Sequence, residues 1–383
     1  MARPVEAVSP KMGTALFKPL FPRRETGRAL SRILIPVLAL LVVSLAALPA
    51  QANPKYAAYV WDTNTGEVLF ERNAEEPRFP ASLTKIMTLY MVFEALEAGR
   101  ISLASPIPVS ENAAAEVPSK LGMRAGSLIT VENAIRSLVT RSANDMATAL
   151  GEMLGGTEAN FARLMTARAR QLGMNDTVFH NAHGLPDPRQ ITTARDMAVL
   201  GYAIREHFPD RYHYFQTREF NFAGQIIGNH NRLLGRVEGV DGIKTGFTRA
   251  SGFNLVSSVR LDGRSIVAVV MGGQTGASRD DHMAALIKEH LPQASTVKSA
   301  DLIVERPTFL PRVAKVHIMP DAMEAPQFRL RDEGPVLVSK PAPATASGTV
   351  DVRTTDTGYA MPARAGGTSL PDASRVREAL GRR

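Results

Sequence analysis

The chain of 383 residues contains no cysteine. This absence excludes a disulfide framework, a thiolate metal site and a cysteine nucleophile. Aromatic residues make up only 6% of the sequence, which leaves few rings for stacking on nucleic-acid bases. The formal charge of +8 comes from the two ends, because residues 1–52 carry +5, residues 335–383 carry +3, and the residues between them balance to zero. The composition therefore argues against a nucleic-acid groove.

Residues 1–52 have the pattern of an export signal. Several arginines precede an apolar run at 33–48, and Ala50-Gln51-Ala52 matches a signal-peptidase cleavage site. The run is short for a membrane span, which needs roughly twenty residues. We therefore expect cleavage after Ala52 and a mature protein in the periplasm, at most peripheral to the inner membrane, with an uncleaved anchor as the alternative.

The stretch 80–93 contains a serine and a lysine three residues apart, Ser82 and Lys85, followed by an almost purely apolar run. This composition predicts a buried helix that begins near Ser82, with the two side chains one turn apart on one face. A lysine whose charged form is disfavoured by burial can take the proton of a serine and make it a nucleophile. The pattern alone also fits a helix cap beside a lysine that extends to water.

Two later stretches decide between these interpretations. Ser142 and Asn144, in Arg141-Ser142-Ala143-Asn144, supply a hydroxyl able to relay protons and an amide able to hold a substrate carbonyl. Lys244-Thr245-Gly246 adds a second cation, another hydroxyl and a glycine that lets a ligand approach a strand edge. Ser-x-x-Lys, Ser-x-Asn and Lys-Thr-Gly in this order form the motif set of penicillin-binding proteins and class A β-lactamases.

With these motifs the sequence resembles the low-molecular-mass penicillin-binding proteins, specifically the D-alanyl-D-alanine carboxypeptidases of the S11 serine peptidase family. The resemblance covers residues 54–292 and includes stretches outside the motifs, such as His183-Gly184-Leu185-Pro186 and Met271-Gly272-Gly273. It implies an α+β fold of the β-lactamase/transpeptidase type, in which an antiparallel sheet is flanked by helices and carries an all-helical subdomain.

The resemblance also implies a role for each motif residue. Ser82 would attack the carbonyl of the penultimate D-alanine of a peptidoglycan stem and form an acyl-enzyme, with Lys85 as its base. Ser142 and Lys244 would assist proton transfer to the leaving D-alanine, and Asn144 would hold the substrate amide. Water would then release the shortened peptide, without a metal or cofactor. β-Lactam antibiotics would acylate the same serine.

The remaining predicted contacts include the points where this sequence departs from its family. Backbone N–H groups of Ser82 and Phe247 would form the oxyanion hole; some relatives have histidine at the second position, but the backbone donor is the same. His230 stands where some relatives have a substrate-positioning arginine. Thr245 and Gly246 would line the substrate site. Arg279 is predicted to bind the terminal carboxylate of the substrate together with Thr245.

The order of patterns along the chain predicts strands at both ends of the domain and helices between them. The Asp-Gly pair at 262–263, between two apolar runs, predicts a hairpin. The predicted segments are a hairpin over 56–71, helices at 131–140, 145–154, 158–172 and 193–206, strands at 252–259 and 265–271, and a helix at 280–290.

The C-terminal part of the chain lacks the pattern of a second folded domain. Residues 53–292 are predicted to form the catalytic domain, and 293–334 a short extension with too few apolar residues for its own core. Residues 335–383 are rich in Pro, Ala, Ser, Thr and Gly, which is typical of a disordered tail. The family's usual membrane-binding helix is not matched, because 374–383 is short and has no aromatic residue. We expect at most weak association with a membrane surface.

Other functions fit the sequence less well. His180 and His183 suggest a metal site, but the sequence shows no nearby acid or third ligand, so loop histidines with backbone hydrogen bonds are the favoured interpretation. The sequence has no Gly-x-Ser-x-Gly elbow, which argues against a Ser-His-Asp hydrolase. It also has no convincing Glu-x-x-Leu-Asn stretch between Ser142 and Lys244, which argues against a class A-like β-lactamase. A non-catalytic peptidoglycan-binding protein would not need every reactive position to be occupied.

Overall fold

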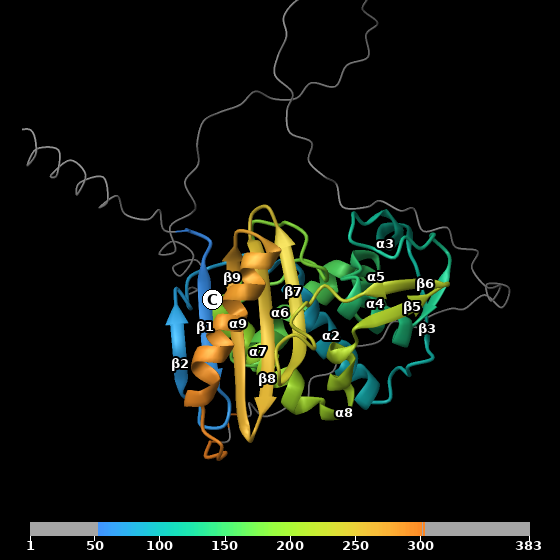
Figure 1. The fold of residues 1–383 in the computed structure, drawn as a ribbon. Helices are drawn as coiled ribbons and strands as arrows, with labels where there is room; N and C mark the ends of the chain where they lie inside the picture. The colour runs from blue at the N-terminus through green and yellow to red at the C-terminus, as the bar shows by residue number, and fades with distance from the viewer. Residues whose placement is uncertain (1–52, 301, 303–383) are drawn as a thin grey trace, which may run out of the picture. The chain divides into compact units, whose positions relative to one another are not determined.

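The structure is a computed structural model in which residues 53–300 and 302 are described (Figure 1). The strands are β1 (Ala57–Asp62), β2 (Val68–Arg72), β3 (Pro106–Pro108), β4 (Leu128–Thr130), β5 (Glu219–Phe222), β6 (Gln225–Gly228), β7 (Val240–Thr248), β8 (Gly252–Leu261) and β9 (Arg264–Gly273). The α-helices are α2 (Thr84–Glu97), α3 (Glu111–Ala115), α4 (Val131–Thr140), α5 (Asn144–Gly155), α6 (Glu158–Gln171), α7 (Ala194–His207), α8 (Pro209–Tyr212) and α9 (Gly276–His290). Short 3₁₀ turns are η1 (Ala81–Leu83), η2 (His213–Gln216) and η3 (Leu291–Gln293).

The central sheet has five antiparallel strands in the order β2-β1-β9-β8-β7. The N-terminal hairpin β1–β2 therefore joins the sheet through β1, which pairs with β9 at the other end of the domain, as predicted for a sheet built from both ends of the domain. Asp262 and Gly263 both have positive φ, 50° and 77°, so they form the tight turn between β8 and β9. This turn geometry suits Asp-Gly and confirms the predicted hairpin.

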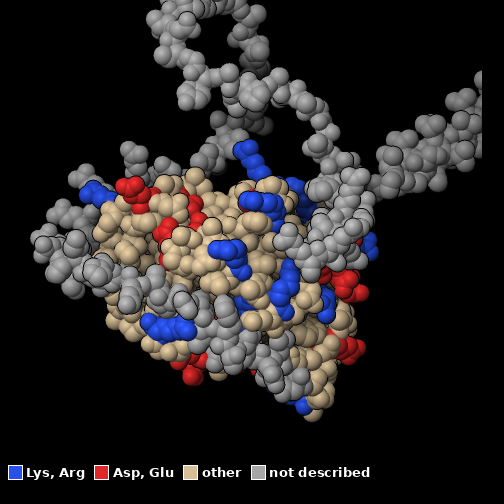
Figure 2. Space-filling view, turned by 180° about the vertical axis from the view of Figure 1, so that it is seen from behind, with Lys and Arg blue, Asp and Glu red and all other residues tan. Residues whose placement is uncertain are grey.

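Helices cover both faces of the sheet. Along β9, Val267 and Val269 belong to the apolar core on the side of α7, whereas Ile266, Ala268 and Val270 belong to the core under α9. Two-sided burial explains why β9 is continuously apolar from Ile266 to Met271 rather than alternating, and why β8 is buried at every position from Asn254 to Val259. In Figure 1, α9 lies in front of the sheet, and α3, α4 and α5 lie to one side of it. Basic and acidic side chains are both spread over the face seen in Figure 2, as expected for a body whose charges balance.

Most of the predicted elements are confirmed, and the differences have local causes. Helix α9 begins at Gly276 rather than at 280, because Thr275 and Ser278 form a reciprocal capping box one turn earlier. The β5–β6 hairpin was not predicted, since its short strands carry little apolar pattern. Thr193 caps α7 as predicted, and its hydroxyl accepts a hydrogen bond from the N–H of Asp196 at 3.0 Å.

The predicted leader over residues 1–52, most of the extension and the tail over residues 335–383 lie outside the described residues. Among the residues that are described, no helix combines the length and the apolar character needed to cross a membrane. The segment just after α9 packs back on the sheet, where the N–H of Ser295 donates to the carboxylate of Asp62 at 2.9 Å.

Candidate active site

Ser82 lies in the tight turn η1 that leads directly into the buried helix α2. The helix is buried at every position from Thr84 to Leu96. It packs between α7 on the side of the sheet and α5 and α6 of the helical region. A helix enclosed in this way must be apolar on nearly every side, as its sequence predicted, and its buried carboxylate, Glu94, pairs with Arg168 at 2.9 Å.

Two glycines hold the Ser82 turn from opposite sides. A Cβ on Gly184 would lie 1.9 Å from the carbonyl oxygen of Ala81, and Gly184 has a φ of +94°. A Cβ on Gly246, in β7, would lie 3.0 Å from the backbone nitrogen of Ser82. Only glycine allows such close approach of backbones. The nucleophile candidate is therefore fixed between a loop and the edge strand of the sheet.

Lys85 meets Ser82 as predicted, and it also meets two oxygen acceptors. Its Nζ lies 3.3 Å from Ser82 Oγ, 2.8 Å from Asn144 Oδ1 and 2.6 Å from the carbonyl oxygen of His183. The side chain is fully buried. Burial lowers the pKa of Lys85 well below its usual value, and the charge of Lys244 lowers it further. An uncharged amine at this position is able to accept a proton from Ser82.

Asn144 and Ser142 come from the start of α5. The side-chain amide of Asn144 donates to the carbonyl oxygen of Val117 at 2.8 Å, while its Oδ1 accepts from Lys85. These two hydrogen bonds fix the orientation of the amide group. Ser142 has a φ of +61° and a buried Oγ with no hydrogen-bond partner among the described residues. A left-handed backbone at serine is uncommon, and an unpaired buried hydroxyl beside a pocket is free to bond a bound molecule.

Lys244 lies in β7 beneath the pocket. It is 1% exposed, and its Nζ donates to the carbonyl oxygen of Thr245 at 2.9 Å. Burial, followed by the charge of Arg279, lowers the pKa of Lys244 to about 7. An amine with this pKa is able both to give and to take a proton near neutral pH.

Most of the predicted residues line one pocket of about 680 Å³, whereas the two predicted lysines, Lys85 and Lys244, are buried and are not part of its lining. Its lining includes Ser82, Ser142, Asn144, Thr245, Gly246, Phe247, His230 and Arg279. The rings of Phe247 and Phe253 stack at a centroid distance of 4.1 Å along its rim, and Phe247 remains 51% exposed. β7 is an edge strand of the described sheet, so its pocket side faces the Ser82 turn instead of another strand.

The electrostatic character of the pocket is positive. Burial, reinforced by the charges of Lys244 and Arg141, lowers the pKa of His230 to about 4, so this imidazole is neutral near pH 7. Arg279 is buried, and its guanidinium donates to the carboxylate of Asp280 at 2.8 Å and to the carbonyl oxygen of Asn254 at 2.7 Å. Arg279 therefore lines the pocket, as the sequence predicted, and these two acceptors fix its position.

The structure corrects the prediction that no acid lies near His183. Its Nε2 is 3.2 Å from a carboxylate oxygen of Glu116 and 3.2 Å from one of Glu158. These three groups are close enough to one another to suggest a metal site. However, the N–H of Leu185 donates to His183 Nδ1 at 3.0 Å, which leaves the ring proton on Nε2, so Nε2 has no lone pair for a metal. Sequence reasoning missed this cluster because its members come from three separate segments.

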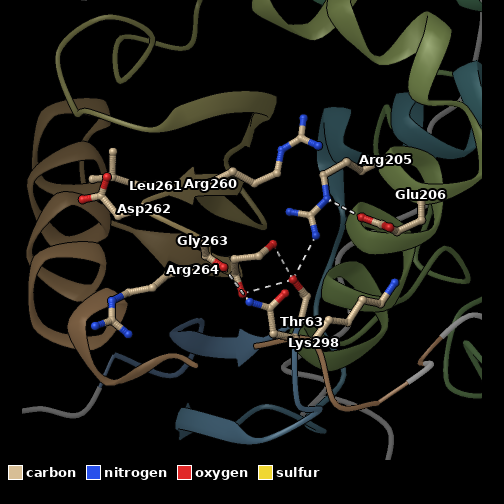
Figure 3. Close-up of a pocket in the computed structure, with 11 residues that line it drawn as sticks. Thr63, Arg205, Glu206, Arg260, Leu261, Asp262, Gly263, Arg264 and Lys298 are labelled. Atoms are coloured by element: carbon tan, nitrogen blue, oxygen red, sulfur yellow. Dashed lines mark hydrogen bonds and ion pairs between the residues drawn. The ribbon is translucent and has the colours of Figure 1, made fainter. Parts of the chain in front are cut away.

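A second pocket, of about 440 Å³, lies at the C-terminal end of β8, whereas the first pocket lies at the N-terminal end of this strand (Figure 3). Arg205 is the buried cation among its lining residues, but its guanidinium is engaged with Glu206, Thr63 and Ser258 at 2.9 Å each. The hydroxyl of Ser265 in its lining is hydrogen-bonded to the hydroxyl of Thr63 at 2.7 Å. This pocket does not resemble a catalytic site.

The comparisons with known proteins agree with this geometry. A family model described as D-alanyl-D-alanine carboxypeptidase, peptidase family S11, matches residues 46–275. The chain belongs to this family. It is 36% identical to the D-alanyl-D-alanine carboxypeptidase DacC of Escherichia coli over 244 residues. That match covers 61% of each protein, so the chain spans less than two thirds of the length of this relative.

Solved structures of penicillin-binding proteins have the same fold. Penicillin binding protein 5 from Haemophilus influenzae superposes with a TM-score of 0.59 at 32% identity, covering 63% of this chain and 72% of that one. Penicillin-Binding Protein D2 from Listeria monocytogenes, in its cefotaxime-bound form, has a TM-score of 0.56 at 28% identity and covers 61% and 95%. The predicted α+β fold of the transpeptidase type is confirmed. The roles of individual site residues remain predictions.

Proposed function

We propose that this protein is a serine D-Ala-D-Ala carboxypeptidase that removes the terminal D-alanine from peptidoglycan pentapeptide stems and is acylated by penicillins. One observation supports this best: the buried amine of Lys85 lies 3.3 Å from the hydroxyl of Ser82 at the bottom of a positively charged pocket. Membership of the S11 family supports the same chemistry.

In the proposed reaction Lys85 takes the proton of Ser82 as Oγ attacks the carbonyl carbon of the penultimate D-alanine. The backbone N–H groups of Ser82 and Phe247 stabilise the negative oxygen of the tetrahedral intermediate. The C–N bond breaks as the proton held by Lys85 passes through Ser142, assisted by Lys244, to the leaving amine, which leaves Lys85 uncharged again. Water then attacks the ester carbon and gives a proton to Lys85. The bond between Ser82 Oγ and the carbonyl carbon breaks as Lys85 returns this proton to Oγ, and the shortened peptide is released.

The pocket also provides for the terminal carboxylate of the substrate. Thr245 and Arg279 line the wall beside Gly246, and the positive charges of Arg279 and of Arg232, which also lines the pocket, make this wall attractive to an anion. His230 is neutral near pH 7, so we propose that it contributes hydrogen bonding and shape rather than charge. We propose that Asn144 also holds the substrate amide through its second side-chain N–H, since Oδ1 accepts from Lys85 and the first N–H is donated to Val117.

The experiment uses the purified mature protein, a soluble peptide ending in D-Ala-D-Ala, and a fluorescent penicillin. We expect free D-alanine in the first assay and a penicilloyl adduct on Ser82 in the second, and neither with Ser82→Ala. An adduct that turns over rapidly without D-alanine release would instead indicate a β-lactamase. Absence of both adduct and release would indicate a non-catalytic binding protein.

We further propose that the mature protein is periplasmic and that its basic tail contributes only weak contact with anionic surfaces. Residues 335–383 carry a net charge of +3. Each basic residue near an anionic membrane contributes about 1 kcal/mol, and salt screens this attraction. Sedimentation with anionic vesicles at low salt, lost near physiological salt and absent after truncation at residue 334, is the expected result. Binding that resists salt would contradict it.

A further inference from the structure

His183 and two carboxylates connect two segments that lie beside the pocket: the loop that contains His183 and the segment 116–119 that contacts Asn144. Glu116 follows α3, Glu158 begins α6, and His183 lies in the loop between α6 and α7. His183 is 5% exposed, and its Nε2–H points between two carboxylate oxygens, each 3.2 Å away. The hydroxyl of Thr148 donates to the same Glu116 oxygen at 3.0 Å. We call Glu116, Glu158 and His183 the brace.

The brace holds the loop that contacts Lys85. The N–H of Ala182 donates to Glu158 at 3.0 Å, and the carbonyl oxygen of Ala182 accepts from the hydroxyl of Thr88, in α2, at 2.6 Å. The next carbonyl along the chain, that of His183, accepts from Lys85 Nζ at 2.6 Å. The position of this carbonyl is therefore set by groups on both sides of it.

The brace reaches the other wall of the pocket through Glu116. The next residue, Val117, accepts the side-chain amide of Asn144 at 2.8 Å. The carbonyl oxygen of Ser119 accepts the backbone N–H of Asn144 at 2.7 Å. Both acceptors of Lys85, the side chain of Asn144 and the carbonyl of His183, are thus held by segments that meet at the brace.

These two acceptors decide where the lone pair of an uncharged Lys85 points. A neutral amine has two N–H bonds and one lone pair. Asn144 Oδ1 and the His183 carbonyl, at 2.8 and 2.6 Å, take the two N–H bonds. The third direction faces Ser82 Oγ at 3.3 Å. The geometry points to the brace as a positioning device for the proposed reaction: it holds the His183 carbonyl so that the lone pair of Lys85 faces the hydroxyl of Ser82.

This inference rests on the proposed function, since it assigns the lone pair of Lys85 the task of taking the proton from Ser82. Burial lowers the pKa of His183, but the hydrogen bonds that its ring donates to Glu116 and Glu158 outweigh burial, and the net shift of the pKa is upward. The charged groups that face Lys85 are Lys244 on β7, Asp145 on α5 and Glu116 of the brace.

Two substitutions at His183 separate the contacts of its ring nitrogens. His183→Asn keeps an acceptor for the N–H of Leu185 but cannot reach the carboxylates. His183→Gln keeps a donor toward the carboxylates but loses the acceptor. We expect His183→Asn to lower the first-order acylation step by about 10- to 100-fold, with little change in the dissociation constant of the non-covalent penicillin complex. His183→Gln should stay closer to the wild type, and His180→Asn, the same change in the same loop, should have no effect.

A third variant uses charge rather than shape. Glu116→Gln keeps an oxygen for His183 Nε2–H but removes a negative charge that raises the pKa of Lys85. Because acylation requires uncharged Lys85, the acid limb of the rate against pH should move to lower pH. A merely structural role would not move this limb. Glu132→Gln, which removes a charge on the surface of α4, should leave it unchanged.

The outcomes are distinct. A wild-type protein that is never acylated would refute the proposed function itself. An acylating wild type with a folded His183→Asn variant of equal first-order rate would overturn the brace. If melting curves show that His183→Asn does not fold, Glu116→Ala decides, because it removes one acceptor of His183 Nε2–H. A first-order rate equal to that of the wild type at alkaline pH, where Lys85 is uncharged in both proteins, refutes the inference.

Discussion

Replacing Gly184 by alanine tests whether the loop that contacts the Ser82 turn sets the geometry of the proposed nucleophile. The new Cβ would lie 1.9 Å from the carbonyl oxygen of Ala81 and 2.3 Å from its carbonyl carbon. Both are backbone atoms, so no side-chain rotation relieves the overlap. The loop and the turn must move apart.

The size of the effect follows from two separate costs. The left-handed backbone, with φ of +94°, costs an alanine about 1–2 kcal/mol. Restoring normal contact with Ala81 moves the turn by about 1 Å or more, and a misplacement of that size in a catalytic site costs about 100-fold in rate. Gly173 provides a matched control, because its φ is +82° and a Cβ there meets nothing within 4 Å.

The assay is the rate of acylation by a fluorescent penicillin, with a urea melt of each variant. We expect Gly173→Ala to lose about 1–2 kcal/mol of stability and to acylate like the wild type. We expect Gly184→Ala to acylate about 100-fold more slowly. Equal acylation rates for two folded variants would show that the close approach of Gly184 does not position Ser82.

Three further substitutions test the charges of the domain. Lys85→Arg should lose acylation at every pH between 6 and 10, because arginine does not deprotonate; a rate recovered at high pH would exclude Lys85 as the base. Burial lowers the pKa of Lys244 to about 7, so the unfolded state binds more protons between that pH and about 10, and stability should rise with pH across this window. Lys244→Met should flatten that rise in urea melts and raise the melting temperature at pH 7 while stopping D-alanine release; an unchanged slope would contradict the lowered pKa. Glu94→Ala should destabilise the fold by about 3–5 kcal/mol in urea, because it leaves the buried guanidinium of Arg168 without its carboxylate partner at 2.9 Å. A loss below 1 kcal/mol would mean that water or another group compensates for that charge.

Much of the secondary structure could be predicted from local sequence patterns. The apolar run after Lys85 predicted a buried helix, the Asp262-Gly263 pair predicted a hairpin, and Thr193 predicted a helix start, and each is confirmed. These features depend on neighbours within a few residues, so they can be recognised without the fold. The β5–β6 hairpin was missed, because each of its strands has only four residues, which is too short to show a clear apolar pattern.

Three sequence motifs were enough to predict which residues carry the reactive groups: two serines, two lysines and an asparagine in a fixed order. The environment that tunes these groups could be described only from the tertiary structure. The two acceptors that orient Lys85, the glycine contacts at the Ser82 turn and the carboxylates around His183 come from segments far apart in the chain. Burial and charge act through space, so the lowered pKa of Lys85 and the state of His183 arise only when folding brings those segments together.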